Sequence, residues 1–340
     1  MKLEEFSYVL PEDRIAQFPA KDRAKCRLMV IDRGSRNVQD AVFENIENLF
    51  SSGDCLVLND TKVMPARLYG KRATGGKVEI FVLEREGSVC EALVRSSRRI
   101  QDGEKIVLES GDQAIVRGYG KIGRTVEFSC MVDDVIARTG HIPLPPYITR
   151  TDERSDASDY QTVYARNEGA TASPTAGLHF TKGLLRKIES KGVKICCVTL
   201  HASYGTFAPI KTDNIEDHSM HEEYYELSQE TAGTINETKR RGGYVYSVGT
   251  TTTRVLETCA MNDGGSYILS EGRGYTNLYV YPGYSFKIVN RLITNFHLPK
   301  STLLLLVSAF AGKELIFDSY RKAIELKYRF FSYGDAMLIL

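Results

Sequence analysis

The sequence contains no tryptophan and has almost no net charge. Its 340 residues carry 44 lysines and arginines against 43 aspartates and glutamates, which gives a formal net charge of +1. This balance provides no overall field that would attract a nucleic acid, so a polyanionic partner must be held by local basic patches. The 19 tyrosines are therefore the main side chains available to stack on a base or a sulfonium.

Cysteine is scarce and shows none of the spacings that hold metals. The chain has seven cysteines, an odd number, and no C-x-x-C motif. This pattern argues against a disulfide framework and indicates reduced, mostly buried thiols. His218 and His221 would share one face of a helix, but no third cluster of ligands accompanies them. We therefore expect no metal site.

Long hydrophobic runs are missing as well. The most apolar tract, residues 303–312, is much shorter than the roughly 20 residues that a membrane span requires. The first residues, MKLEEF, are acidic, whereas a signal peptide would begin with basic residues. We expect a cytoplasmic protein with no membrane partner. The oligomeric state is left open.

The pattern of apolar and polar residues changes twice along the chain. CLVLND (residues 55–60) is a short apolar run typical of a strand buried on both faces. Residues 66–145 form short alternating runs separated by glycine, as in an antiparallel barrel, and the later chain alternates strands with helices. We predict an α/β fold, in which a large domain with a mixed sheet (1–65 and 146–340) carries an inserted antiparallel β-barrel domain (66–145).

Two tracts place a histidine among small residues that allow a ligand close to the backbone. These are GATASPTAGLHFT (169–181), with His179, and TLHASYGTFAP (199–209), with His201. A helix and a strand separate them, so both imidazoles are predicted to emerge on one rim of the sheet. Histidine titrates near neutral pH and can move protons there. The alternative is that each is a hydrogen-bonded structural residue.

Two strand ends offer further polar groups. A strand that ends at Gly249 is followed by four threonines and a helix expected to begin near Arg254, where free N–H groups can hold a carboxylate or phosphate. Simple N-capping by threonine is the alternative. Asp60 ends the strand 55–60 and is a candidate acid–base group or the start of an Asx-turn.

Long motifs follow one another along nearly the whole chain. They are YVLPEDRIAQFPAKDR (8–23), LNDTKVMPARL, GGKVEIFVLE, HIPLPPYI, PTAGLHFT, GTFAPI, HSMHEEYY, SVGTTTTRVLE, TNLYVYPGYSFKIVNRLITNFHLPKSTLLLLVSAF and YRFFSYGDAMLIL. In these motifs and their order the chain resembles the S-adenosylmethionine:tRNA ribosyltransferase-isomerase family of queuosine biosynthesis. The resemblance implies an α/β domain with an inserted barrel. It also implies transfer and isomerisation of the ribosyl part of S-adenosylmethionine onto 7-aminomethyl-7-deazaguanine at the wobble position of tRNA, giving epoxyqueuosine, adenine and methionine.

The resemblance implies no cofactor, because S-adenosylmethionine is a co-substrate, and it makes a tRNA anticodon loop the partner. For this reaction we expect His179 or His201 to transfer protons with Asp60 as the second group. The expected substrate-binding residues are Thr175, Gly177, Gly205, Thr206, Phe207, Gly249, Thr250, Thr251 and Arg254. Among them, Thr250, Thr251 and Arg254 would hold the methionine carboxylate or a tRNA phosphate, and Gly177, Thr206 and Phe207 would line the nucleoside pocket.

The chain departs from the family pattern at two positions. It has Ser203 where glycine is usual and Thr171 where valine is usual, which puts the pocket geometry in question. Two other functions remain open. One is a nucleoside or sugar-phosphate transferase that acts without RNA, and the other is a non-catalytic RNA-binding protein.

Overall fold

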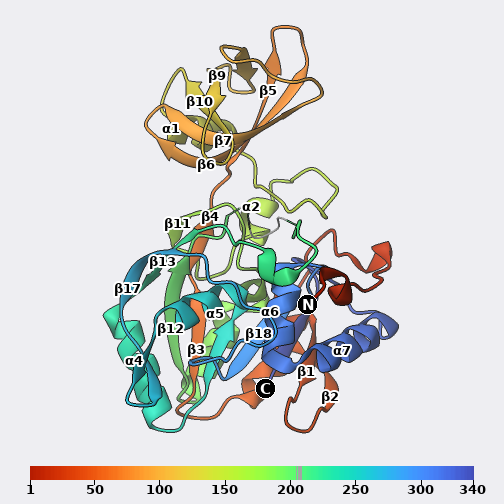
Figure 1. Ribbon diagram of the computed structural model, residues 1–340, viewed down its shortest axis with the longest axis vertical. Coiled ribbons are helices and arrows are strands. Elements are labelled where there is room, and N and C mark those ends of the chain that lie inside the picture. Colours follow the sequence, from red (N-terminus) through yellow and green to blue (C-terminus); the bar gives the residue numbers. More distant parts are fainter. Residues whose placement is uncertain (204, 206–208) are drawn as a thin grey trace. The chain divides into compact units, whose positions relative to one another are not determined.

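The computed structural model describes residues 1–203, 205 and 209–340, which form two compact units. The larger unit comprises Met1–Lys62, Pro145–Arg150 and Ser158–Leu340, and the smaller comprises Val63–Leu144 and Thr151–Ala157. Figure 1 shows both, with the two chain ends in the larger unit. None of the described helices is both long enough and apolar enough to cross a bilayer.

The larger unit is built on one nine-stranded mixed sheet, as expected for an α/β fold. The strand order is β17-β13-β12-β3-β14-β18-β19-β1-β2, with parallel pairing from β12 through β18 and between β19 and β1. The strands are β1 (Arg27–Ile31), β2 (Val38–Val42), β3 (Cys55–Asn59), β12 (Lys194–Leu200), β13 (Glu223–Leu227), β14 (Val245–Val248), β17 (Gly272–Thr276), β18 (Arg291–Asn295) and β19 (Ala336–Ile339).

Alternating side chains of the central strands fill two separate cores, one on each face of the sheet. In β3, Cys55 and Val57 belong to one core, and Leu56 and Leu58 belong to the other. Because both faces of this strand are covered, its residues are apolar at successive positions. The covering helices are α4 (Gln229–Arg240), α5 (Gly249–Thr258), α6 (Thr302–Ala311) and α7 (Lys313–Glu325) on the first face, and α3 (Lys182–Ser190) with the 3₁₀ helix Phe43–Leu49 on the second.

Hydroxyl side chains start three of these helices. Thr181, Ser228 and Ser301 each accept a hydrogen bond from a backbone N–H in the first turn of α3, α4 and α6. Helix α5 is different, because it begins at Gly249, at φ +87°, and has no side-chain cap. The alternative of simple N-capping by threonine is therefore excluded, and the helix starts five residues before the predicted position near Arg254.

The smaller unit is a closed barrel of six antiparallel strands, which confirms the predicted second part of the fold. Residues such as Leu68, Ile80 and Val126 are fully buried in it, and Leu68 and Val126 alternate with partly buried positions along their strands. Its elements are β5 (Arg67–Arg72), β6 (Lys77–Glu86), β7 (Val89–Ser96), β8 (Lys105–Leu108), β9 (Gln113–Tyr119), β10 (Arg124–Phe128) and α1 (Val132–Thr139).

The remaining elements are short. They are β4 (Thr61–Val63), β11 (Asn167–Ala170), α2 (Asp156–Asp159) and the hairpin of β15 (Ala260–Asp263) and β16 (Ser266–Leu269).

The segment that enters β18 depends on one buried carboxylate. Glu257 of α5 accepts hydrogen bonds from the backbone N–H groups of Lys287 (2.8 Å), Ile288 (3.0 Å) and Val289 (3.1 Å), and from the Tyr284 hydroxyl (3.2 Å). Glu257→Gln replaces one acceptor oxygen by a donor that faces other donors. We expect the free energy of unfolding, measured with urea, to fall by about 1–3 kcal/mol.

Glu314→Gln is the matched control, because the Glu314 side chain is 87% exposed and pairs only loosely with Arg36 at 3.7 Å. Its effect should stay within about 0.5 kcal/mol. Equal effects of the two substitutions would contradict the role given to Glu257.

Candidate functional site

A cavity of about 580 Å³ lies in the larger unit, where β12, β14 and β18 end. Ala202 lies just beyond β12, Gly249 follows β14, and Asn295 is the last residue of β18. The carboxyl edge of an open α/β sheet is the usual place for a ligand, because helix N-termini and loop groups converge there. The volume is in the range of small-molecule sites.

The cavity wall is mostly apolar and carries almost no formal charge. Phe296, Phe331, Ile210 and Leu303 are among the apolar residues that line it. Lys300 is the single charged residue among the described lining residues, and its ammonium lies 2.5 Å from a carboxylate oxygen of Glu4. No aspartate or glutamate is found among those lining residues.

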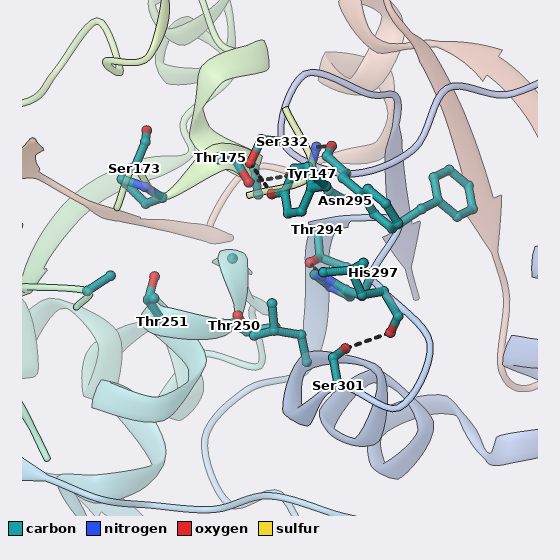
Figure 2. Close-up of a pocket in the computed structure, with 18 of the residues that line it drawn as sticks. Tyr147, Ser173, Thr175, Thr250, Thr251, Thr294, Asn295, His297, Ser301 and Ser332 are labelled. Carbon is teal, nitrogen blue, oxygen red and sulfur yellow. Dashed lines mark hydrogen bonds between the residues drawn. The ribbon is translucent and has the colours of Figure 1, made fainter. Parts of the chain in front are cut away.

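Hydroxyl and amide groups from distant parts of the chain meet on one side of this cavity (Figure 2). The Tyr147 hydroxyl lies 2.6 Å from Ser332 Oγ, and Thr175 Oγ1 donates to Asn295 Oδ1 at 3.2 Å. Across from them, the first turn of α5 presents Thr250 and Thr251.

His179 lies behind this wall. It ends the 3₁₀ helix Thr175–His179 and is 4% exposed. Its Nδ1 lies 3.0 Å from Cys26 Sγ and its Nε2 lies 3.1 Å from Asn295 Nδ2. Burial, helped by the charges of Arg23 and Arg329, lowers the pKa of the imidazole to about 3, so it is neutral at pH 7.

His201 follows β12 and is half-buried. Its Nδ1 lies 2.8 Å from Thr61 Oγ1, and its ring stacks on Tyr224 with centroids 5.5 Å apart. Burial lowers the pKa of His201, and the carboxylates of Asp60 and Glu226 partly oppose this shift. The ring is therefore mostly neutral at pH 7 and able to accept a proton.

Neither His179 nor His201 is among the described residues that line the cavity. The two imidazoles were expected from the sequence to meet at one rim of the sheet. The structure does not bring them together in this cavity. His179 contacts the cavity only through Asn295, and His201 is the residue before Ala202, which lines it.

Comparison with known proteins adds the family. The model of the family described as queuosine biosynthesis protein matches residues 3–339. The chain belongs to this family. Proteins named S-adenosylmethionine:tRNA ribosyltransferase-isomerase from Halothermothrix orenii and Caldanaerobacter subterraneus subsp. tengcongensis are 50% and 48% identical to it over the full length of both chains. The crystal structure of S-adenosylmethionine tRNA ribosyltransferase from Thermotoga maritima is 37% identical, covers 99% of this chain and 100% of its own, and has a TM-score of 0.58.

In this member of the queuosine biosynthesis protein family, Asp60 is a structural anchor. Its carboxylate is 1% exposed and accepts hydrogen bonds from Thr199 Oγ1 (2.7 Å), Asn167 Nδ2 (3.1 Å) and Arg166 Nε (2.5 Å). These contacts tie the 166–167 segment to the end of β3. Because the carboxylate is buried and both of its oxygens already accept hydrogen bonds, the geometry gives no support to Asp60 as an acid–base group.

Arg254 is likewise engaged. Its guanidinium is buried, pairs with Glu223, and donates to the carbonyls of Leu278 (2.9 Å) and Thr276 (3.2 Å). Breaking a buried pair of this kind is strongly unfavourable, since it leaves a desolvated charge without a partner. The structure therefore gives no support to Arg254 as a free binding group for a carboxylate or phosphate.

Two predicted glycines are explained by packing. A Cβ on Gly177 would lie 2.0 Å from the hydroxyl oxygen of Tyr164, and one on Gly205 would lie 2.7 Å from the His221 ring. Neither glycine is among the described cavity-lining residues. Thr206 and Phe207, which were also predicted to bind the substrate, lie outside the described residues.

The four remaining predicted binding residues, Thr175, Gly249, Thr250 and Thr251, all line the cavity. Thr251 Oγ1 also accepts a hydrogen bond from Asn59 Nδ2 at 3.1 Å.

The structure accommodates one of the two departures from the family pattern. Ser203 donates its backbone N–H to Glu223 Oε1 (2.8 Å), and its Oγ accepts from the Gly205 N–H (3.3 Å). Thr171 is 5% exposed and its hydroxyl has no hydrogen-bond partner in the described part of the chain, so the structure does not explain this departure.

Sequence reasoning assigned no role to several polar residues of the wall, among them Tyr147, Asn295, His297 and Ser332. They belong to motifs that carried the resemblance, but no spacing links them because they are up to 185 positions apart. His297 is buried, and its Nε2 lies 2.9 Å from Thr294 Oγ1.

Burial also lowers the pKa of His297 to about 3, as it does for His179. Both imidazoles stay neutral in the folded protein, whereas in the unfolded chain they take up protons below about pH 6.5. The unfolded state then binds more protons, so stability falls as the pH falls. We expect each histidine to contribute roughly 1 kcal/mol per pH unit to the free energy of unfolding between about pH 6 and 4, measured with urea.

His297→Gln removes one of these two titrating groups. It should therefore remove about half of the pH dependence of stability that the two histidines cause together. Thr294→Val is the control, because it removes the hydrogen-bond partner without changing the number of titrating groups. It should lower stability equally at each pH. An unchanged slope in His297→Gln would contradict the assignment.

Proposed function

We propose that this chain transfers and isomerises the ribosyl group of S-adenosylmethionine onto 7-aminomethyl-7-deazaguanine in tRNA, releasing adenine and methionine and leaving epoxyqueuosine. The observation that carries this proposal is the full-length relationship at 46–50% identity to proteins that bear the name of this activity. S-adenosylmethionine acts as a co-substrate, with no resident cofactor. A tRNA substrate also points to the cytoplasm.

The cavity at the carboxyl edge suits the adenosyl group. Apolar walls such as Phe296 and Phe331 match the faces of a purine, and the few hydroxyl and amide groups match its polar edges. Thr250 and Thr251 lie at the first turn of α5, where backbone N–H groups have no partner within the helix.

The reaction needs proton transfer at several points. The sulfonium acidifies the C5′ hydrogens, loss of one of them gives an ylide, adenine departs with a proton, and the amine of the modified base attacks the sugar. His201 is the candidate that the geometry favours for one of these transfers. It is neutral at pH 7 and oriented by Thr61, whereas Asp60 and His179 are held in buried hydrogen bonds.

The decisive experiment is to incubate the protein with S-adenosylmethionine and tRNA that carries the precursor base, and to analyse the nucleosides by mass spectrometry. We expect epoxyqueuosine in the tRNA together with free adenine. Adenine release without tRNA would favour the nucleoside or sugar-phosphate transferase. Binding of tRNA without any product would favour the non-catalytic RNA-binding protein.

His201→Gln keeps the bulk and polarity of the side chain but cannot carry a proton at neutral pH. With tRNA saturating, we expect kcat for adenine release to fall by about 10²–10⁴-fold. A kcat within threefold of the unsubstituted protein would remove His201 from the mechanism.

The tRNA is proposed to bind through its anticodon loop, where a wobble base can be splayed out without opening a duplex. The sequence has three basic clusters, at 95–99, 239–241 and 321–329. In the first, Arg95, Arg98 and Arg99 of the barrel are exposed. In the second, Arg240 and Arg241 at the end of α4 form ion pairs with Glu237.

The triple substitution of Arg95, Arg98 and Arg99 by glutamine should raise the KM for tRNA and flatten its salt dependence. Each lost phosphate contact lowers the log–log slope by about 0.7–0.9. Arg240→Gln with Arg241→Gln is the control and should leave the slope unchanged. Equal slopes for the triple variant and the unsubstituted protein would exclude these arginines from the tRNA surface.

A further inference from the structure

A chain of buried hydrogen bonds runs from Cys26 to the cavity wall, and the proposed mechanism does not use it. Cys26 Sγ lies 3.0 Å from His179 Nδ1, and His179 Nε2 lies 3.1 Å from Asn295 Nδ2. Asn295 Oδ1 accepts from Thr175 Oγ1 at 3.2 Å. His179 and Asn295 are 4% and 3% exposed, so no bulk water competes for these bonds.

A backbone carbonyl determines which atom donates in each hydrogen bond of the series from Cys26 to Thr175. Asn295 Nδ2 lies 3.2 Å from the carbonyl oxygen of Phe331, which can only accept a hydrogen bond. The amide nitrogen is therefore at this end, and its second hydrogen points to His179 Nε2. That nitrogen must accept, so the ring hydrogen is on Nδ1 and points to Cys26 Sγ. The lowered pKa of His179 agrees with such a neutral ring.

The direction in which the hydroxyl hydrogen of Thr175 points follows in the same way. Because Asn295 Oδ1 can only accept, Thr175 spends its one hydrogen on that bond. Thr175 is only partly buried and lines the cavity, so its oxygen can meet a ligand there only as an acceptor. A carboxylate or phosphate oxygen would be repelled by the lone pairs of Thr175 Oγ1. An N–H or O–H group of a ligand would instead donate a hydrogen bond to this oxygen.

We propose that Thr175 accepts a hydrogen bond from an amino or hydroxyl group of the nucleoside part of S-adenosylmethionine, and that His179 and Asn295 are the positioning residues that hold it in that role. This proposal rests on the proposed function and changes the part played by His179, from proton transfer to orientation.

Ser173 supplies an independent observation on the same stretch of wall. Its hydroxyl is buried, the residue is 6% exposed, and Oγ has no hydrogen-bond partner among the residues that the structure describes. It lines the same cavity two residues before Thr175 (Figure 2). A buried hydroxyl without a partner is unfavourable, and a polar group of a bound ligand removes that cost.

Two pairs of variants test the proposal by steady-state kinetics of adenine release, with tRNA saturating. Thr175→Val removes the acceptor at nearly constant volume, and Thr175→Ser restores it. His179→Leu removes the acceptor for Asn295, whereas in His179→Gln the side-chain oxygen takes the place of Nε2. We expect the KM for S-adenosylmethionine to rise by about 5–30-fold in Thr175→Val and His179→Leu, and to stay within threefold in Thr175→Ser and His179→Gln.

The double variant separates positioning from a general loss of structure. If His179 acts through Thr175, then adding His179→Leu to Thr175→Val should change the KM by less than twofold. Multiplication of the two effects would overturn the proposal, as would a rise in the KM for tRNA in place of that for S-adenosylmethionine. A fall of kcat by 100-fold or more in His179→Gln would make His179 a proton-transfer group and overturn it too.

The tautomer can be read in the unsubstituted protein, so the test does not depend on whether a variant folds. Long-range ¹H–¹⁵N spectra should show His179 as a neutral ring with its hydrogen on Nδ1 from pH 5 to pH 8. A hydrogen on Nε2, or protonation in this range, would refute the proposal. These outcomes differ from failure of the proposed function, in which the unsubstituted protein would release no adenine at all.

Discussion

Charged and amide side chains that are buried around the nine-stranded sheet must find partners within the protein, and this constraint organises the larger unit. Arg254 joins α5 to β13 through Glu223 and to the end of β17 through a backbone carbonyl. Glu257 holds the segment that enters β18. Asn295 joins the wall of the cavity to the Phe331 carbonyl. An unpartnered charge here would cost several kcal/mol, so these contacts are effectively obligatory.

The same constraint separates residues that look catalytic from those that can meet a substrate. Asp60, Arg254 and His179 belong to residue types that often act in catalysis or ligand binding. Here each of them is already engaged in buried polar contacts within the protein. Most of the polar groups that line the cavity are hydroxyls and an amide, such as Thr175 and Asn295. These three ionisable residues therefore hold neighbouring segments in place, whereas the cavity wall offers mainly neutral polar groups.

Local patterns were sufficient to predict the fold class. The run at 55–60 is β3 followed by Asp60, and the alternating runs between 66 and 145 form the barrel. The start of α5 was misplaced because β-branched threonines resemble a loop, whereas Thr252 and Thr253 bond back to the carbonyls of Val248 (2.7 Å) and Gly249 (3.2 Å). The site was only partly predictable, because the contact between residues 147 and 332 has no local signature.

The almost uncharged wall of the cavity has an energetic consequence for a sulfonium substrate. No carboxylate is among the described lining residues, so no opposite charge on that surface compensates a sulfonium for the water it leaves behind. The neutral thioether of methionine and neutral adenine need no such compensation. In the proposed reaction, binding in this cavity would therefore raise the free energy of the reactant more than that of the products, and loss of the positive charge on sulfur would favour cleavage.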